Sequence, residues 1–366
     1  MRILVLSKRQ YTGKDLLDDR YGRLYEIPAA LAACGHEVVG VALSYRRRPF
    51  GWYRWDDQPG LTWFAINALP GGLWRYPRRL AEIVATLRPE IIWACSDAFH
   101  AIAGATFSRV TGIPLVIDLY DNFESFAATR LLGVGPLFRA ACRRAVGLTV
   151  VSLMLHDYVI SAYKVKTPVV TIGNGVRKEL FYPRNQREMR LKLGLPVNAR
   201  LIGTAGAISA DRGIAVLFDA FFKLAADNPL LYLAFAGHRD ATPSRYHHPR
   251  ILDFGVLSYE SIPEFYSALD VAVICNRDSL FGRYCFPQKL YEIIACHTPL
   301  VAAEVGDVRK LLIDHPDSLY QPGNAGDLAE KINKQLDRRC LINRTPLTWM
   351  ELSHKLEDFL RMVAKN

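Results

Sequence analysis

Glu292 is an acidic residue within the largely apolar segment "FPQKLYEIIACHTPLVAA", residues 286–303. A carboxylate is almost never fully buried without a partner, because removing its water costs several kcal/mol. Two kinds of partner fit the spacing. Two adjacent hydroxyls, as on a ribose, would bind the carboxylate, or Lys289 (i,i+3) or Gln288 (i,i+4) would contact it locally. The spacing leaves both interpretations open.

Pro287 suits the first turn of a helix, where its missing N–H would be unpaired in any case. A helix that begins after the loop at 276–286 presents free backbone N–H groups and the positive end of its dipole. We therefore expect a phosphate-binding helix start, with the Glu292 carboxylate more than one turn further along.

Length and charge limit the classes of protein that need to be considered. A chain of 366 residues exceeds the usual size of one core, so two domains of roughly 150 to 200 residues are expected. The 46 Lys and Arg against 36 Asp and Glu give a net charge of +10. This charge favours anionic partners such as nucleotides, phosphorylated substrates, nucleic acid or an acidic membrane face, and does not choose among them.

The seven cysteines are scattered, odd in number and without C-x-x-C spacing, so neither a disulfide framework nor a zinc site is indicated. A reducing cytoplasm fits this usage. The first apolar run reaches Lys8 and Arg9 too early for a signal sequence, and no apolar stretch approaches about 18 residues. We expect a cytoplasmic protein that is not integral to the membrane.

Short apolar runs rich in β-branched residues alternate with helical patterns, which is typical of a parallel sheet covered by helices. Residues 1–168 are predicted to form one doubly wound domain, and a second α/β series begins near "TPVVTIGNGV" and fills residues 169–349. The end of the chain predicts an amphipathic helix whose apolar side carries Trp349, Leu352, Leu356, Phe359 and Leu360. Two parallel-sheet domains bind ligands at the carboxyl ends of their strands, so a shared cleft is the expected place for a site.

Several ordered segments resemble glycosyltransferase family 4. They are "GHEVVGVAL", "IGNGVRKELFYP", "GAISADRGIAVLFDAF", "LAFAGHRD", "ILDFGVLSYESIPEFYSALDVAVI" and "FPQKLYEIIACHTPLVAAEVGDV". The resemblance implies the GT-B fold: two Rossmann-like domains face each other across a cleft, and the C-terminal helix, 350–366, packs back on the N-terminal domain. It also implies a retaining, hexosyltransferase-type enzyme that moves a sugar from a nucleotide-sugar donor, UDP- or GDP-linked, in polysaccharide or glycolipid biosynthesis.

By this resemblance Glu292 binds the ribose of the donor. The family often has a second glutamate eight positions earlier, where this chain has Tyr284, and an Arg where it has Ala207. The family Lys is matched by Arg212, which can contact phosphate oxygens in a bidentate manner; alternatively Arg212 is a solvated turn residue. Arg283 or Arg239 would compensate for the missing cation. The implied donor-binding residues are Gly22, Arg212, Gly237, Gly255, Val256, Leu257, Tyr284, Phe286, Pro287, Gln288, Lys289 and Glu292.

In the first domain the resemblance points to the glycine loop at Gly22 and to the end of "PLVIDLYDNFESF". Gly22 would let backbone donors approach the diphosphate, or is simply a turn. Tyr120 aligns with a family His, and Tyr120 and Asp121 would bind the acceptor, although Asp121 could equally cap the following helix. Asp121, Arg212 and Glu292 are the expected catalytic residues.

The implied reaction needs no cofactor and no metal, since the leaving diphosphate can take the acceptor proton and no convincing Asp-x-Asp motif is present. The expected acceptor is a saccharide or a lipid-linked saccharide. "SYRRRPFGWYRW" and "LWRYPRRLAEIVATLR" mix Arg with aromatics, which suits an anionic membrane surface and peripheral attachment to the inner face of the cytoplasmic membrane, unless the aromatics pack inward.

Other classes stay open. They are a nucleotide-sugar epimerase of the same architecture and a non-enzymatic nucleotide- or nucleic-acid-binding protein. A dinucleotide oxidoreductase is less favoured, because the first strand leads into "SKRQYTGKD" and not into G-x-G-x-x-G. No nucleic-acid-binding module is recognisable, so nucleic acid is not an expected partner.

Overall fold

The computed structural model describes residues 1–11 and 13–365, which divide into two compact units. The first unit contains Met1–Asn174 and the carboxy-terminal helix from Trp349, and the second contains Gly175–Thr348. The sequence analysis predicted the domain boundary at 168/169, which puts the strand in "TPVVTIGNGV" in the second domain. That assignment is wrong, because this strand hydrogen-bonds to the edge of the first sheet, with Val169 opposite Leu148.

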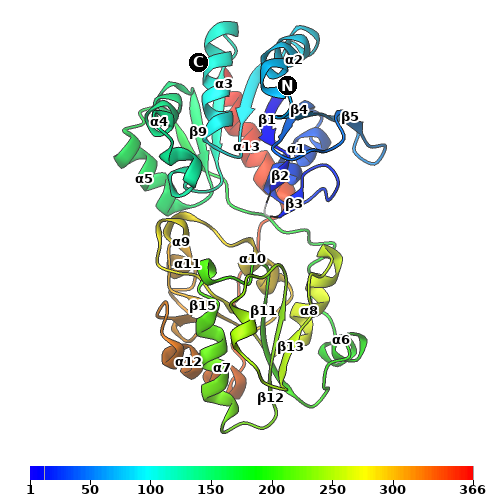
Figure 1. The fold of residues 1–366 in the computed structure, drawn as a ribbon, viewed down its shortest axis with the longest axis vertical. Helices are drawn as coiled ribbons and strands as arrows, with labels where there is room; N and C mark the ends of the chain where they lie inside the picture. Colours follow the sequence, from blue (N-terminus) through cyan, green and yellow to red (C-terminus); the bar gives the residue numbers. More distant parts are fainter. Residues whose placement is uncertain (12, 366) are drawn as a thin grey trace. The chain divides into compact units, whose positions relative to one another are not determined.

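The first unit is built on an eight-stranded sheet (Figure 1), in which every neighbouring pair is parallel except the outermost one, β5 with β6. The strand order across the sheet is β10-β9-β8-β7-β1-β4-β6-β5. The strands, in chain order, are β1 (Arg2–Lys8), β4 (Glu37–Ser44), β5 (Gly51–Arg54), β6 (Leu61–Asn67), β7 (Ile91–Ala94), β8 (Leu115–Leu119), β9 (Gly147–Val150) and β10 (Val169–Thr171). The central strand β1 has five consecutive fully buried residues, 3–7, as expected for a parallel sheet covered on both faces.

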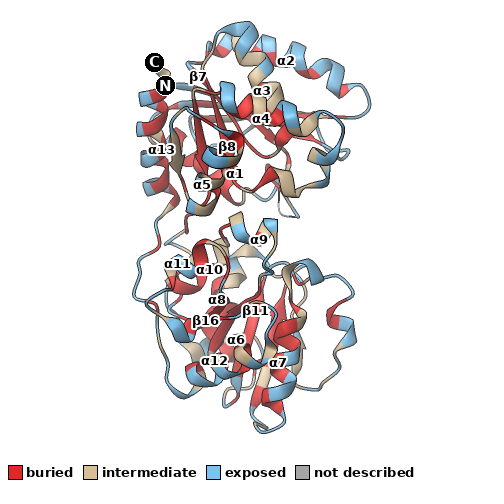
Figure 2. Ribbon diagram, turned by 90° about the vertical axis from the view of Figure 1, so that its left-hand side faces the viewer, coloured by how far each residue is buried: buried red, intermediate tan, exposed pale blue. Residues whose placement is uncertain are grey.

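Helices cover this sheet, and their outer faces are exposed (Figure 2). They are α1 (Arg23–Ala33), α2 (Gly72–Leu87), α3 (Ala98–Thr111), α4 (Val134–Arg144), α5 (Leu153–Tyr163) and α13 (Trp349–Ala364), with the 3-10 turns η1 (Phe123–Ser125) and η2 (Ala127–Arg130) and the two-stranded ribbon β2 (Gln10–Tyr11) and β3 (Lys14–Asp15). Within the described residues, none of these or the other helices is long and apolar enough to span a bilayer.

The terminal helix α13 packs on α1 and on β9 of the first sheet. The five side chains predicted for its apolar side are all buried. Gly147 of β9 leaves room for this helix, since a Cβ at that position would lie 2.6 Å from Phe359 Cζ. The predicted amphipathic helix and its return to the first domain are confirmed.

The second unit has a six-stranded, wholly parallel sheet in the order β13-β12-β11-β14-β15-β16. The strands are β11 (Arg200–Ala205), β12 (Leu231–Ala236), β13 (Ile251–Asp253), β14 (Val271–Ile274), β15 (Leu300–Ala303) and β16 (Leu319–Tyr320). Counted along the chain this order is 3-2-1-4-5-6, that of a doubly wound nucleotide-binding sheet. The predicted α/β class, with two Rossmann-like domains, is confirmed.

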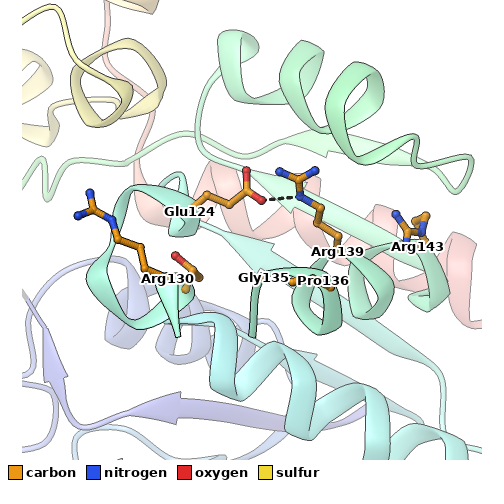
Figure 3. A pocket seen from close by; sticks show the side chains of 7 residues that line it. Glu124, Arg130, Gly135, Pro136, Arg139 and Arg143 are labelled. Atoms are coloured by element: carbon orange, nitrogen blue, oxygen red, sulfur yellow. Dashed lines mark hydrogen bonds and ion pairs between the residues drawn. The ribbon is translucent and has the colours of Figure 1, made fainter. Parts of the chain in front are cut away.

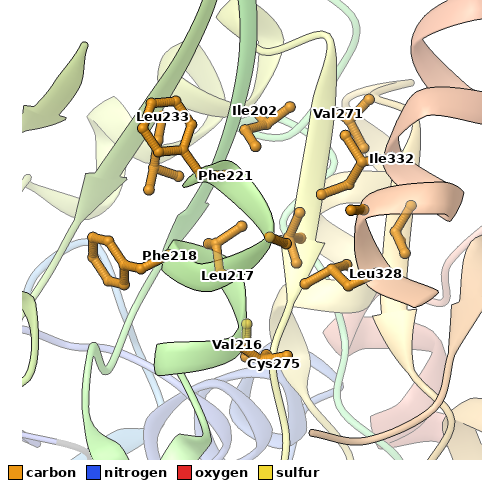
Figure 4. Close-up of a cluster of buried hydrophobic side chains, with 14 of the residues drawn as sticks. Ile202, Val216, Leu217, Phe218, Phe221, Leu233, Val271, Cys275, Leu328 and Ile332 are labelled. Carbon is orange, nitrogen blue, oxygen red and sulfur yellow. The ribbon is translucent and has the colours of Figure 1, made fainter. Parts of the chain in front are cut away.

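The core of the second unit lies between the sheet and helices α7 and α12 (Figure 4). Leu217 and Phe221 of α7 pack with Ile202 and Leu233 of the strands, and Ile332 of α12 packs beside them. The helices of this unit are α6 (Gln186–Lys192), α7 (Ala215–Ala225), α8 (Ile262–Ala268), α9 (Leu280–Tyr284), α10 (Gln288–Ala295), α11 (Asp307–Leu311) and α12 (Ala325–Asp337), with the 3-10 turns η3 (Ala210–Arg212), η4 (Pro243–Arg245), η5 (Tyr259–Ser261) and η6 (Pro316–Ser318).

A fully buried ion pair joins α1 to the first sheet. Arg23 Nη2 lies 2.6 Å from Asp118 Oδ1, and neither side chain is exposed to solvent. Arg23 Nη1 also donates to the carbonyls of Ile172 and Gly173, at 2.6 Å each, and Thr149 Oγ1 donates to Asp118 Oδ1. One guanidinium therefore fixes the start of α1, the end of β8 and the chain that leaves β10.

We expect Asp118→Asn to destabilise the protein by about 3 to 5 kcal/mol, because it leaves the buried Arg23 charge without its counter-charge. Urea unfolding measured by circular dichroism gives the change. Glu82→Gln is the matched control, since its partner Arg79 is in an exposed pair that contributes little. Equal unfolding midpoints for Asp118→Asn and the wild type would contradict the assigned role.

Candidate functional site

Each sheet has one switch point, where its strand order reverses, and glycine, cysteine or polar residues follow the strands there. In doubly wound sheets ligands bind outside the carboxyl ends of the strands at this switch point. In the second unit the point lies between β11 and β14, and β11 leads into Gly206. In the first unit it lies between β1, which ends at Lys8, and β7, which leads into Cys95 and Ser96.

Two glycines, Gly206 and Gly237, follow the ends of β11 and β12 and contribute backbone to the surface there. Gly237 has φ of 133°, and a Cβ on it would lie 1.8 Å from the carbonyl oxygen of Gly206, so no other residue fits. Gly237 N–H also donates to Gly255 O, at 2.6 Å, after β13. The structure thus brings the predicted Gly237 and Gly255 together. Val256 is exposed and Leu257 half-buried next to them.

Two cations, Lys289 and Arg212, lie near this surface and act on each other electrostatically. A Cβ on Gly206 would lie 3.4 Å from Lys289 Nζ, which places the ammonium directly over the glycine. The Arg212 guanidinium lies 3.9 Å from the centre of the Phe281 ring. Neither cation has an ion pair with an acidic side chain in residues 1–11 and 13–365. Burial lowers the pKa of Lys289 to about 8, and the charge of Arg212 adds to the lowering. We call Lys289 and Arg212 the cation pair.

The two other arginines considered as replacements for the missing family cation are already paired. Arg239 Nη1 lies 2.7 Å from Asp253 Oδ1, and Arg283 Nε lies 2.5 Å from Asp278 Oδ1. The idea that Arg239 or Arg283 compensates for Ala207 is therefore not supported. Lys289 is the second cation that the structure offers beside Arg212.

Glu292 is 5% exposed and accepts two hydrogen bonds on the same oxygen, Oε1. Gln288 Nε2 donates at 2.9 Å and the Tyr259 hydroxyl at 3.2 Å. The local i,i+4 contact with Gln288 is therefore present, whereas Lys289 makes no ion pair with Glu292. Burial raises the pKa of the carboxyl to about 7, and the two hydrogen bonds and the Lys289 charge offset only part of that effect. Oε2 accepts no hydrogen bond from any described residue.

The residues just before Glu292 are placed by two short helices. Tyr284 is the last residue of α9 and is half-buried, and Phe286 packs on Tyr291 with 5.0 Å between ring centres. Pro287 was expected inside the first turn but lies one residue earlier, as the N-cap of α10, with ψ of 111°. The helix therefore begins at Gln288, and no side chain caps it.

In the first unit, Tyr120 is buried at the end of β8, and its hydroxyl accepts a hydrogen bond from Lys8 Nζ at 2.9 Å. Burial lowers the pKa of Lys8, and Asp97 and Asp121 offset part of this. Asp121 is half-buried. The alternative that it caps the next helix is wrong, since Asn122 Oδ1 accepts from Glu124 N–H at 3.1 Å and is the cap of η1.

The structure explains Gly22 by packing. Its φ is 74°, and a Cβ would lie 2.5 Å from Tyr11 Cε1. A turn that passes against the Tyr11 ring requires glycine without any ligand. The assignment of Gly22 to the diphosphate is therefore not tested by this geometry.

Sequence reasoning missed Lys8, Tyr259 and the pair Asp97–His100. Asp97 caps α3 and contacts His100 Nδ1 at 2.8 Å, close to Ser96, whose φ is 89°. A polar run after β7, "CSDAFH", was the available signal. Tyr259 lies 33 positions before its carboxylate partner, and no local pattern reveals that contact.

The fold consists of two Rossmann-like units, and the second unit carries the cation pair and the buried Glu292 carboxylate. The family model Glycosyltransferase Family 4 matches residues 23–180, and the model Glycosyl transferases group 1 matches residues 199–338. These models cover the two units in turn, and the chain belongs to the family 4 glycosyltransferases.

Similar proteins agree with this assignment. The protein named TuaC of Bacillus subtilis, a teichuronic acid biosynthesis glycosyltransferase by its name, is 26% identical over 73% of this chain and 69% of its own length. The curated relatives are matched over 33 to 69% of their lengths. Sucrose-phosphate synthase from Thermosynechococcus elongatus has a TM-score of 0.80 at 18% identity, covering 99% of this chain and 98% of its own. Anabaena HepE in complex with UDP has a TM-score of 0.74 at 19% identity, covering 99% and 100%. The two structures show the shared fold.

We expect the stability of the wild type relative to Glu292→Gln to fall as pH rises from about 4.5 to above 7. The folded carboxyl keeps its proton up to its pKa of about 7, whereas the unfolded carboxyl has lost it, so the folded state binds more protons over this interval. The difference should reach about 3 kcal/mol in chemical unfolding experiments across that range. A difference that does not change with pH would show that Glu292 is not held in a desolvated position.

Proposed function

We propose that this chain transfers a sugar from a nucleotide-sugar donor to a saccharide or lipid-linked acceptor, with retention of the anomeric configuration, in bacterial-type surface polysaccharide or glycolipid assembly. One observation carries the proposal. Lys289 lies over Gly206 at the switch point of the second sheet, the charge of Arg212 acts on Lys289, and within residues 1–11 and 13–365 neither cation has an ion pair with an acidic side chain. An anionic ligand would supply their counter-charge.

A nucleoside diphosphate sugar fits this arrangement. Its diphosphate would bind the cation pair, and Gly206 and Gly237 let phosphate approach the backbone closely. Its ribose hydroxyls would donate to Glu292, whose Oε2 is not occupied by any described residue. Hydroxyl donors favour the ionised carboxylate and would lower its pKa below about 7. HepE binds UDP on the same fold, which supports a UDP-type donor here.

The chemistry follows from these roles. The bond between the anomeric carbon and the diphosphate oxygen breaks, and the acceptor oxygen forms a new bond on the same face. The departing diphosphate takes the acceptor proton, so no side chain has to act as a nucleophile. Lys289 is mostly protonated at neutral pH, because its pKa is about 8, and with Arg212 it stabilises the charge that develops on the leaving group.

We assign the acceptor to the carboxyl edge of the first sheet. Tyr120 and Asp121 follow β8 there, and Lys8 holds the Tyr120 hydroxyl. Asp121 would orient the acceptor hydroxyl. We further propose that no divalent metal takes part; a rate that collapses in EDTA and returns with Mg²⁺ would contradict this.

The segments rich in Arg and aromatics support peripheral membrane attachment. Phe50 is 78% exposed, Trp52 53% and Trp74 88%, so the alternative that these aromatics pack inward does not hold for them. Arg47 and Arg75 are exposed close by in the chain. Exposed aromatics with basic neighbours fit an anionic lipid interface.

We expect UDP or GDP to raise the melting temperature of the wild type in a screen of UDP, GDP, ADP and CMP. We also expect Glu292→Ala to lower kcat/KM by about 100-fold or more, because two hydrogen bonds between the carboxylate and the ribose hydroxyls are lost. Glu292→Ala should stay folded, because a desolvated carboxylate is removed. Lys355→Ala, exposed on α13, is the control. Near-normal turnover of Glu292→Ala would exclude its role, and no shift with any nucleotide would exclude the function.

We expect Phe50→Ser combined with Trp74→Ser to lower sedimentation with anionic phosphatidylglycerol vesicles by about tenfold at low salt, because two exposed aromatics no longer enter the interface. Binding of the wild type should weaken at high salt. Leu230→Ser, an exposed apolar residue in the second unit, is the matched control. Equal partition of the wild type to neutral and anionic vesicles would count against the attachment.

A further inference from the structure

A cavity of about 530 Å³ in the first unit is lined by three arginines and one glutamate. Arg130 lies in η2, and Arg139 and Arg143 lie one turn apart on the same face of α4. Figure 3 shows Glu124 between Arg130 and Arg139. This volume falls within the range of about 300 to 1,000 Å³ that is typical of small-molecule sites. We call this space the arginine cavity.

The charges around the arginine cavity do not balance. Glu124 Oε1 accepts from Arg139 Nε at 2.6 Å, and its Oε2 accepts from the Tyr158 hydroxyl at 2.8 Å. Both carboxylate oxygens therefore already have a hydrogen-bond donor. Arg143 Nη1 reaches only the carbonyl of Tyr163, at 3.4 Å. Arg130 forms no ion pair with any residue in the described ranges. Two guanidinium groups are therefore left without counter-charge.

Exposed leucines are close in sequence to residues that line the arginine cavity. Leu131 and Leu132 directly follow Arg130, and Leu137 follows Pro136, which lines the cavity. Leu131 and Leu137 are 58% exposed, and Leu132 is completely exposed. Exposed leucines beside unneutralised arginines match a ligand that is charged at one end and apolar at the other.

The arginine cavity is also connected to the proposed acceptor residues. Phe123 contacts the ring of Tyr120, with 5.4 Å between ring centres, and the ring of Phe138 on α4, with 5.8 Å. Glu124, which lines the cavity, follows Phe123 in η1. One aromatic row therefore joins the end of β8 to the helix that carries Arg139 and Arg143.

We propose that the arginine cavity binds the phosphate that joins the acceptor saccharide to a lipid, with Leu131, Leu132 and Leu137 in contact with the lipid chain. This assignment rests on the proposed transferase function and specifies its acceptor class. The phosphate supplies the counter-charge that is missing beside Arg130 and Arg143, and guanidinium groups bind phosphate oxygens in a bidentate manner. Arg139 holds Glu124 in place and is a positioning residue.

The full chain is tested by sedimentation with phosphatidylcholine vesicles that contain either phosphatidic acid or oleate at matched surface charge. Oleate reproduces the charge without the phosphate. We expect the wild type to bind the phosphatidic acid vesicles more tightly, and Arg130→Gln with Arg143→Gln to lower that binding about tenfold, to the level seen with oleate. Leu131→Ser with Leu132→Ser should weaken binding to both kinds of vesicle.

Arg144→Gln is the matched charge control, because Arg144 is an exposed neighbour on α4 that does not line the cavity. The proposal is overturned if Arg130→Gln with Arg143→Gln loses no more binding than Arg144→Gln, or if the wild type does not distinguish phosphatidic acid from oleate.

A second experiment uses no vesicles and measures the binding of inorganic pyrophosphate by calorimetry. Saturable pyrophosphate binding that needs Arg130 and Arg143, without phosphate-dependent vesicle binding, would overturn the lipid assignment. The UDP-dependent melting shift is measured on the same samples, so failure of the donor site is seen separately.

Discussion

The Arg23–Asp118 pair is the interaction on which the first unit depends, because it joins three parts of the chain and both side chains are fully buried. A buried charge is tolerated only when its donors are used, and Arg23 uses them on Asp118 and on the carbonyls of Ile172 and Gly173. Asp118 belongs to β8, and Tyr120 and Asp121 follow two and three residues later. The ion pair thus helps to set the position of Tyr120 and Asp121, the proposed acceptor residues, although it is itself fully buried.

In the second unit, glycines and not a buried ion pair set the geometry at the ends of the strands. Parallel strands bring Gly206 and Gly237 side by side, and their close approach leaves no space for a Cβ on Gly237. Lys289, carried on α10, then lies over Gly206. Strand order determines where the ends of β11 and β14 meet, and the glycines determine what can approach them. Strand order and the two glycines together determine the position of Lys289.

Much of the fold could be predicted from the sequence, because alternating apolar runs and helical patterns are local signals. The apolar side of α13 is an example. Contacts over long distances in the chain could not be predicted. Whether Arg239 is available to a ligand depends on Asp253, and the partners of Glu292 include Tyr259, 33 positions away. The strand at 169–171 looks the same whichever sheet it joins, so its place at the edge of the first sheet needed the structure.

The bare peptide surface at Gly206 and Gly237 limits how this protein could diverge. Where a pocket wall is made of side chains, one base change can reshape it and alter the molecule that is accepted. Gly237 has no side chain to exchange, and adding one would push the ends of β11 and β12 apart, since its Cβ would lie 1.8 Å from Gly206 O. Selectivity at such a surface would change through the neighbouring side chains and loops, because Gly237 itself has no space for a Cβ.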